Sequence, residues 1–581
     1  MTNQPGFASV EALDWPSRGT NRTRFDERPQ AVRAWLDELP LVNLGETGRR
    51  VHDTLCDLHT IGLSSRQRLD VLGLFDGVVT YLINGLRSLY QQQPLPLTNR
   101  GRNAAILTTT LCEEMTRGYR LCLLMDKGGI TGLRRKYRAQ ASLHVCRYAG
   151  TALLESWLRH GQPPPGTWAT LHEVWKDARQ RHIHQKTISV ADGPRRVDDI
   201  YKQLLLTEAA NPWRMPRGEV LRVYNLLGRY AGKASLLSRG DRAADKAVFA
   251  VDQSRDKGPG SLLNSADREG EEVVLIVTEG LSRSFNHHLR MRNARFRLRR
   301  AADESEIDRI RRLITALGST PHRHHARKAA GQGAALVIGL SHVHRILLEK
   351  RSFGTVPSCA RISRFHAREL KTDLSREEDD IWSLSYVPGP AADPDQGQIP
   401  PRATADTGSS ERFWTVTNSS SGGYCLSADG GNKSRAQVGE LVILTETGDT
   451  TRPNWQTGVI RWIKGSEMEG TQMGVQLIAP CPHPVFTRAE QPGGRLSDPS
   501  RCLLIPAMPE VEQPVTLVTP LLHYSMDRRV YLMGKDHTGE LHLTGQVEDS
   551  GLFRQFTFRR LGSVNPADTR VPDYQTLWSS I

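Results

Sequence analysis

The apolar residues of this chain change their spacing near residue 320, and this change limits what the chain can fold into. From about 46 to 250 they recur every three or four residues, which is the spacing of one helix face. One such stripe consists of Leu72, Phe75, Val79, Leu82, Leu86 and Leu89. After 320 apolar and polar residues alternate within short runs that glycines separate, as is typical of strands. We therefore expect an α+β multidomain protein, with an all-α first part and a β-rich second part.

The helical part, 31–250, contains recognisable stop signals. A second stripe runs through Leu107, Leu111, Met115, Tyr119 and Cys122. A third helix is predicted over 133–159, and Gly161 with the prolines at 163–165 should end it. Further helices are expected from Thr167 and over 220–230. No repeat period is visible, so a helical bundle and a solenoid of paired helices both remain open.

The region 251–320 has a mixed pattern and should connect the two parts. The run EEVVLIVTEG predicts one buried strand, and a helix is expected over 305–317. Between them lies a basic tract, 287–300, which has many arginines and no acidic residue. The formal net charge of the chain is +14, so polyanions should be attracted to it. The tract could bind nucleic acid or an anionic membrane surface, or it could be a solvated helix face.

Short strand candidates separated by turn signals predict a small antiparallel β-barrel within 321–505. They lie at 334–340, 413–417, 424–427, 441–444, 457–463 and 473–478. The segment 387–411 has five prolines and few apolar residues, so we expect a flexible insertion there. A further β module is expected over 506–581, as a separate piece or an extension of the barrel. Residues 1–30 are polar and predicted to be a disordered tail.

Four segments of the β-rich part together resemble the second half of a PilZ domain, a bacterial β-barrel that binds cyclic di-GMP. They read WTVTNSSSGGYCL, VGELVIL, WQTGVIRWIKG and TQMGVQLIAP. The family motif, Asp or Asn, any residue, Ser, two of any, Gly, is here Asn418 to Gly423. A second family motif, Arg-x-x-x-Arg, is matched by Arg323 to Arg327, before the predicted strand AALVIGL. A long insertion separates the two motifs, where the family has a short strand and loop.

The resemblance implies a cyclic di-GMP site formed by Arg323, Arg327, Asn418, Ser420 and Gly423. Arginine can hold guanine edges or phosphate with two parallel hydrogen bonds. Asn418 and Ser420 offer short polar side chains, and Gly423 permits a positive φ and a close backbone approach. Two simpler interpretations stay open. NSSSGG could be only a polar turn between strands, and RHHAR could be only a solvated charge cluster.

The sequence predicts neither a metal site nor an enzyme. Histidines at alternate strand positions could face one side, but no cysteine lies near them to complete a closed site. These histidines are His322, His324, His325, His342 and His344. The eight cysteines form no CxxC pair and are interpreted as buried thiols. No P-loop, GxSxG, HExxH or dinucleotide motif is present, so we expect no cofactor and no catalysis.

These patterns favour a bacterial signalling protein. It would bind cyclic di-GMP through the barrel and pass the signal to a protein partner through the helical domain. The first alternative is a scaffold with a barrel that binds no nucleotide, and the second is a nucleic-acid-binding protein that uses the tract 287–300. We find no signal peptide and no run of about 20 apolar residues that could span a bilayer, so a cytoplasmic location is expected.

Overall fold

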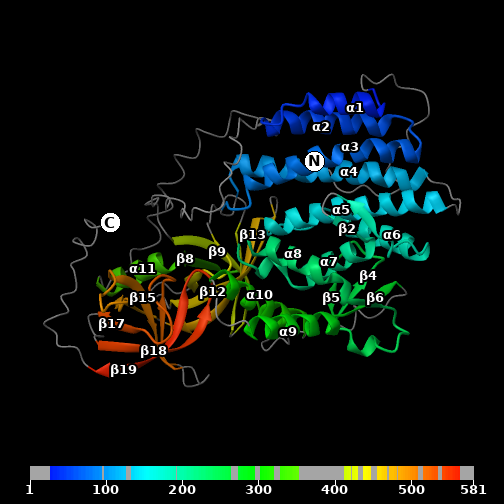
Figure 1. The fold of residues 1–581 in the computed structure, drawn as a ribbon. Coiled ribbons are helices and arrows are strands. Elements are labelled where there is room, and N and C mark those ends of the chain that lie inside the picture. Colours follow the sequence, from blue (N-terminus) through cyan, green and yellow to red (C-terminus); the bar gives the residue numbers. More distant parts are fainter. Residues whose placement is uncertain are drawn as a thin grey trace. The chain divides into compact units, whose positions relative to one another are not determined.

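The computed structural model divides the chain into two compact units that meet in sequence near residue 323. The structure describes residues 26–93, 97–125, 132–190, 193–262, 272–294, 301–318, 328–352, 411–420, 422–428, 436–446, 455–466, 470–480, 482–507, 514–533 and 539–562. The first unit is mainly helical and the second is made of two β-barrels (Figure 1). The predicted fold class is therefore confirmed. Of the predicted tail 1–30, residues 1–25 lie outside the described residues, and helix α1 already begins at Pro29. The predicted insertion 387–411 also lies outside the described residues.

Sequence signals start and stop the helices of the first unit. The helices of this unit are α1 (Pro29–Asp37), α2 (Leu44–Thr60), α3 (Ser65–Ser88), α4 (Asn99–Met125), α5 (Gly132–Leu158), α6 (Thr167–Gln180), α7 (Val197–Ala209), α8 (Glu219–Tyr230), α9 (Glu279–Ala294) and α10 (Ala301–Gly318). Ser64 and Gln67 form a reciprocal capping box at the start of α3, and Asn43 caps α2. Gly166, with φ of 78°, precedes α6, after the three prolines that keep α5 from continuing.

The helices form a bundle and not a solenoid. In a solenoid each repeat contacts only its neighbours along the chain. Here α2 packs on α4 as well as on α3, and α5 packs on α3, α4, α6, α7 and α8. Buried residues from Val32 to Leu317 belong to a single hydrophobic core. Helix α5 lies at the centre of this arrangement (Figure 1).

Small sheets complete the helical unit. The predicted buried strand is β6 (Val273–Val277), and it pairs with β3 (Ser235–Leu237) and β4 (Phe249–Asp252). Further pairs join β4 to β5 (Gly260–Ser261) and β1 (Ile188–Val190) to β2 (Gly193–Arg195). Apart from β6, these strands have two to four residues. Period-two spacing cannot be recognised over so few residues, so the sequence did not predict them.

Helix α3 is long and apolar enough to cross a membrane by length and composition alone. This differs from the expectation that no segment would qualify. The structure gives another reason for its composition, because Leu72, Phe75 and Val79 lie fully buried in the bundle core. Arg68 on the same helix is also buried, and its guanidinium donates to the carbonyl oxygens of Leu58 and Ile61.

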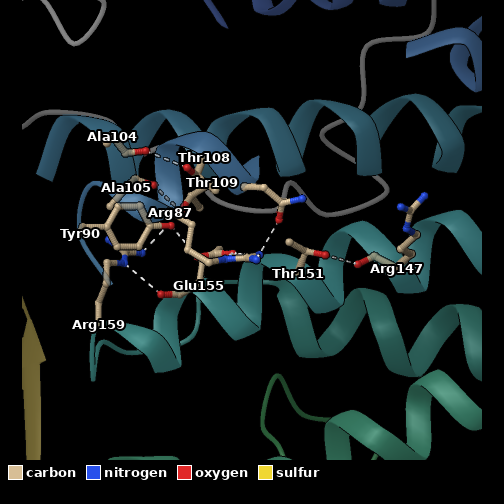
Figure 2. A network of polar contacts seen from close by, with 11 residues as sticks. Arg87, Tyr90, Ala104, Ala105, Thr108, Thr109, Arg147, Thr151, Glu155 and Arg159 are labelled. Atoms are coloured by element: carbon tan, nitrogen blue, oxygen red, sulfur yellow. Dashed lines mark hydrogen bonds and ion pairs between the residues drawn. The ribbon is translucent and has the colours of Figure 1, made fainter. Parts of the chain in front are cut away.

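A buried carboxylate joins α3 to α5. Glu155 on α5 is fully buried, and its side chain accepts hydrogen bonds from Arg87 on α3 and from the hydroxyl of Tyr90 (Figure 2). The Arg87 Nε lies 2.8 Å from the Glu155 Oε1. Arg159, directly after the end of α5, donates to the Glu155 carbonyl oxygen at 3.1 Å. Burial, and then the Glu155 charge, raise the pKa of Tyr90 well above its ordinary value.

The first barrel is a closed ring of six antiparallel strands. They are β8 (Gly333–Ile338), β9 (Glu411–Ser420), β10 (Gly423–Ala428), β11 (Leu441–Glu446), β12 (Gln456–Ser466) and β13 (Gly470–Pro480). Around the ring the order is β8, β9, β10, β13, β12, β11 and back to β8. A short strand, β7 (Lys328–Ala329), pairs with the far end of β9. All six predicted strands are present.

A second closed barrel follows the first. Its strands are β14 (His483–Ala489), β15 (Ser500–Ile505), β16 (Thr516–Thr519), β17 (Arg529–Met533), β18 (Gly539–Asp549) and β19 (Arg554–Gly562). The barrel begins at β14, whereas the sequence placed this boundary at 506. The reason is that turn residues mark where a strand ends but do not show which sheet it joins.

Helix α11 (Leu340–Ser352) packs against strands of both barrels. Its Val343, Ile346 and Leu347 share one core with residues of both. From the first barrel these include Val337 and Leu441, and from the second Leu503, Val518 and Phe553. The sequence did not predict this helix, because the alternation of β8 was read through to residue 340.

Candidate functional site

A β-bulge in β9 turns the NxSxxG motif to the outside of the first barrel. Val416 pairs with Leu426, and Asn418 pairs with Cys425, so Thr417 is an extra residue on β9. Val416 and Leu426 lie in the barrel core. Because side chains alternate along a strand, Cys425 beside Leu426 points outward, and Asn418 opposite Cys425 does the same. Without the extra residue, Asn418 would follow Val416 into the core.

The same register separates the serines of the motif. Ser420 lies two residues beyond Asn418 and opposite Gly423, so it shares the outer face. Ser419 lies opposite Tyr424, which packs against the barrel core, and therefore faces inward. Asn418 and Ser420 are both partly exposed. The Ser420 hydroxyl donates to the carbonyl oxygen of Gly423 at 3.3 Å, which holds the strand-to-strand turn closed.

Gly423 is required by a close backbone approach. A Cβ at this position would lie 2.2 Å from the carbonyl oxygen of Val475 on β13. Its φ does not fall in the left-handed region, so the expected need for a positive φ is wrong. Glycine lets β10 and β13 approach each other directly beside Asn418 and Ser420.

The outer face continues onto β13 and β12. Gln476 lies opposite Gly423, and its Oε1 accepts a hydrogen bond of 2.7 Å from the Nε of Arg461. Gly474 lies opposite Cys425 and also opposite Trp462. The indole of Trp462 covers Gly474 so closely that a Cβ there would lie 1.9 Å from its Nε1. Trp462 is partly exposed.

Arg461 links this face to the second barrel. Its Nη2 lies 3.0 Å from Glu548 Oε2 on β18, so its charge is already paired. Arg461, Gln476 and Trp462 are not among the site residues predicted from the sequence. One signal was available for Trp462, because a glycine inside a strand, such as Gly474, often marks a close approach by another group.

Strand β7, which directly follows the other PilZ motif in the sequence, pairs with this end of β9. Lys328 pairs with Ser419, and Ala329 pairs with Asn418. Lys328 is exposed and follows Arg327 directly in the sequence. Arg323 and Arg327 themselves lie outside the described residues.

A polar cluster joins Gln332, which directly precedes β8, to Glu446 at the end of β11 and to Tyr424 on β10. Gln332 donates a hydrogen bond to the carboxylate of Glu446. Burial, followed by hydrogen bonding to Glu446, raises the pKa of Tyr424 to about 12. Tyr424 therefore stays protonated at neutral pH and can donate a hydrogen bond to an acceptor.

Two of the histidines considered for a metal site, His342 and His344, lie on helix α11 and not on a strand. The other three, His322, His324 and His325, lie outside the described residues. His344 is buried, with its Nε2 3.1 Å from the Val485 carbonyl oxygen. Burial lowers the pKa of His344 to about 4. It is a neutral core residue that joins α11 to β14.

Three consecutive family models match the chain. Residues 30–242 match the N-terminal domain of the cyclic-di-GMP receptor FimW, 248–484 match its middle PilZ domain, and 485–561 match its C-terminal β-barrel domain. The middle model begins well before 320, where the PilZ resemblance starts in the sequence. Its end at 484 agrees with the start of the second barrel at β14.

Whole-chain comparison points to the same family. A protein of Pseudomonas aeruginosa named cyclic-di-GMP receptor FimW is 26% identical, and the match covers all of both chains. No solved structure matches. The PilZ resemblance drawn from the sequence is confirmed, and the chain belongs to the FimW family of cyclic-di-GMP receptors, with a PilZ domain at its middle.

Proposed function

We propose that this protein binds cyclic di-GMP on the outer face of its first barrel, through Asn418 and Ser420 together with Arg327 and Arg323. The observation that supports this most is the bulge at Thr417, which turns Asn418 and Ser420 outward on one face. A polar turn with no binding role would not need the inward and outward side chains of β9 to exchange faces at Thr417. The bulge therefore favours a ligand site over a simple turn.

Chain connectivity supports a role for the arginines. Lys328 pairs with Ser419, and consecutive Cα atoms are about 3.8 Å apart, so Arg327 is bonded to a residue beside the motif. Arginine forms paired hydrogen bonds to phosphate or to guanine O6 and N7. The short arms of Asn418 and Ser420 would then reach base edges or phosphate oxygens.

A matched pair of serine variants tests the site. Purified full-length protein is titrated with cyclic di-GMP by calorimetry, with GTP as a control ligand. Ser420→Ala should weaken binding about fivefold, since a neutral hydrogen bond contributes about 1 kcal/mol. Ser419→Ala removes the same group from the inward face and should leave affinity unchanged. Folded wild-type protein that shows no heat with excess ligand would instead support the scaffold alternative.

Transfer of the signal to a protein partner is the second part of the proposal. Its support is an open groove of about 460 Å³ along α1 and α3, where Leu41 is 42% and Tyr81 46% exposed. Large apolar side chains exposed together are typical of contact surfaces. Capture from a bacterial lysate, with and without cyclic di-GMP, should give a ligand-dependent partner that Tyr81→Arg abolishes. Identical captures in both conditions would argue against relay.

A further inference from the structure

Four potential metal ligands gather between α2 and α4 of the helical unit. His52, Cys56 and His59 follow one another at intervals of four and three residues on α2, so they share one face of the helix. Glu114 extends from α4 toward that face. The ligand atoms of His52, Cys56 and Glu114 all lie within 4.8 Å of one another. None of these residues takes part in the cyclic di-GMP site.

From these contacts we propose that His52, Cys56 and Glu114 bind a zinc ion and that this ion joins α2 to α4. Nitrogen, sulfur and carboxylate oxygen together form a ligand set that zinc prefers, and hard cations such as Mg²⁺ would not use the thiolate. Three protein ligands leave a fourth tetrahedral position for water. The proposal is independent of cyclic di-GMP binding.

The distance between the two ligands on α2 fits a tetrahedral ion. The Cys56 Sγ lies 3.6 Å from the His52 Nε2. With Zn–S near 2.3 Å and Zn–N near 2.0 Å, a tetrahedral centre separates these two atoms by about 3.5 Å. A zinc ion would therefore fit between them with little movement of the helix.

A carboxylate behind His52 fixes the imidazole for this role. The His52 Nδ1 lies 3.2 Å from the Asp53 Oδ1, so the proton is held on Nδ1 and the lone pair of Nε2 points toward Cys56. Histidines that bind metal characteristically donate their other nitrogen to a carboxylate in this way. This contact is independent of the distances among the three ligands and points to the same site.

Glu114 is held in place from the opposite side. The His59 Nε2 lies 3.1 Å from the Glu114 Oε2 and 3.0 Å from its carbonyl oxygen. The His59 ring has room because Gly118 stands opposite it on α4, where a Cβ would approach the ring to 2.9 Å. His59 is thus a positioning residue for the Glu114 carboxylate.

The charges around Cys56 also favour a cation. The carboxylates of Glu114, Asp53 and Asp57 all act on the Cys56 thiol as nearby negative charges. Arg117 is a nearby positive charge that acts in the opposite direction. A zinc ion would hold Cys56 as the thiolate, and one proton would be released on binding.

Cobalt titration of the full chain tests the site, because Co²⁺ bound to a thiolate gives a charge-transfer band that histidine sites elsewhere cannot produce. Protein stripped with a chelator should bind one Co²⁺ with this band, and Zn²⁺ should displace it. Cys56→Ala should lose the band, and Glu114→Gln should weaken binding by about tenfold or more. Cys122→Ala, at a buried cysteine two turns along α4, is the matched control and should keep the band.

A second measurement covers the case in which Cys56→Ala fails to fold. Alkylation of Cys56 in the wild type, followed by mass spectrometry, should slow when Zn²⁺ is added. Binding would also raise the melting temperature of the wild type, since an ion that binds only the folded state stabilises it. An absent band in folded wild type, a band that survives Cys56→Ala, or alkylation of Cys56 at an unchanged rate would overturn the proposal.

Discussion

The carbonyl oxygen of Val475 lies 2.2 Å from the point where a Cβ on Gly423 would stand. Backbone atoms cannot rotate away as a side chain can, so Gly423→Ala must push β10 away from β13. We expect a lower melting temperature and weaker cyclic di-GMP binding, because the displaced strand carries the turn next to Ser420. Differential scanning calorimetry and ligand titration measure the two effects.

Gly465 on β12 provides the control for this substitution. Nothing lies within 4 Å of a Cβ at Gly465, and its φ is not in the left-handed region. Gly465→Ala should therefore change the melting temperature little. Equal losses in the two variants would show that glycine is needed in these strands for a reason other than the Val475 contact.

Arg327→Ala should weaken cyclic di-GMP binding by roughly ten- to a hundred-fold. A paired, charge-assisted contact contributes about 1.5–3 kcal/mol, and about 1.4 kcal/mol is tenfold. Arg323→Ala should have the smaller effect, because Arg327 directly precedes Lys328 of β7 in the sequence, whereas Arg323 is four residues further from it. Arg311→Ala, at an exposed position on α10, serves as the charge control. Unchanged affinity in both motif variants would remove the arginines from the site.

Asn418→Asp distinguishes two orientations of the ligand. If Asn418 faces guanine N–H groups, the carboxylate is a stronger acceptor and affinity should hold or rise. If it faces a phosphate, the two negative charges repel each other and affinity should fall. Affinities measured at low and high salt check the assignment, since screening should weaken the repulsion. An affinity that is unchanged at both salt concentrations would place Asn418 outside the contact.

Spacing predicted the fold class and the six strands of the first barrel, because β8 to β13 are long enough for alternation to show. The same signal failed where elements were short or changed type. Helix α11 begins two residues after β8 ends, and the apolar residues of β8 are followed, after Gly339, by Leu340, the first residue of the helix. Strands β1 to β5 have two to four residues, too few for an alternation to be recognised.

The sequence supplied the candidate site but not its geometry. Asn418 and Ser420 were selected through the PilZ motif, yet only the pairing register shows the extra residue at Thr417. Of the two properties expected of Gly423, the structure shows the close backbone approach but not the positive φ, which is a local angle that sequence does not reveal. The zinc ligands were missed entirely, since Glu114 comes from another helix and Cys56, which is only partly buried, was interpreted as a buried thiol.

Glu155→Gln should strongly destabilise the helical unit. The substitution keeps the shape of the side chain but removes the charge that pairs with Arg87, whose side chain is only 14% exposed. An uncompensated buried charge costs about 3–5 kcal/mol. Asp308→Asn breaks the exposed pair with Arg311 and should cost at most about 1 kcal/mol. Urea unfolding compares the two, and similar losses would show that the Glu155 contacts contribute little.

Glu113 should make the stability of the helical unit depend on pH. Burial, and then the charge of Glu114, raise the pKa of Glu113 from 4.5 to about 8. Between these two pH values the folded state holds a proton that the unfolded chain has lost. The contribution of Glu113 to the free energy of unfolding should therefore be complete below pH 4.5. This contribution should be lost as the pH rises to about 8.

The Glu113→Gln variant has no carboxyl group at this position to titrate. Its free energy of unfolding should therefore increase relative to that of the wild type as the pH rises. Each unit of pKa shift corresponds to about 1.4 kcal/mol, so the gain should be on the order of 3–5 kcal/mol at pH 8. Glu46→Gln is the control, because hydrogen bonds from Arg50 and Arg49 lower the pKa of Glu46, and its effect should be constant between pH 5 and 8. Urea unfolding at pH 5, 6, 7 and 8 gives the comparison. A constant difference between Glu113→Gln and the wild type would show that Glu113 is ionised in the folded protein throughout this range.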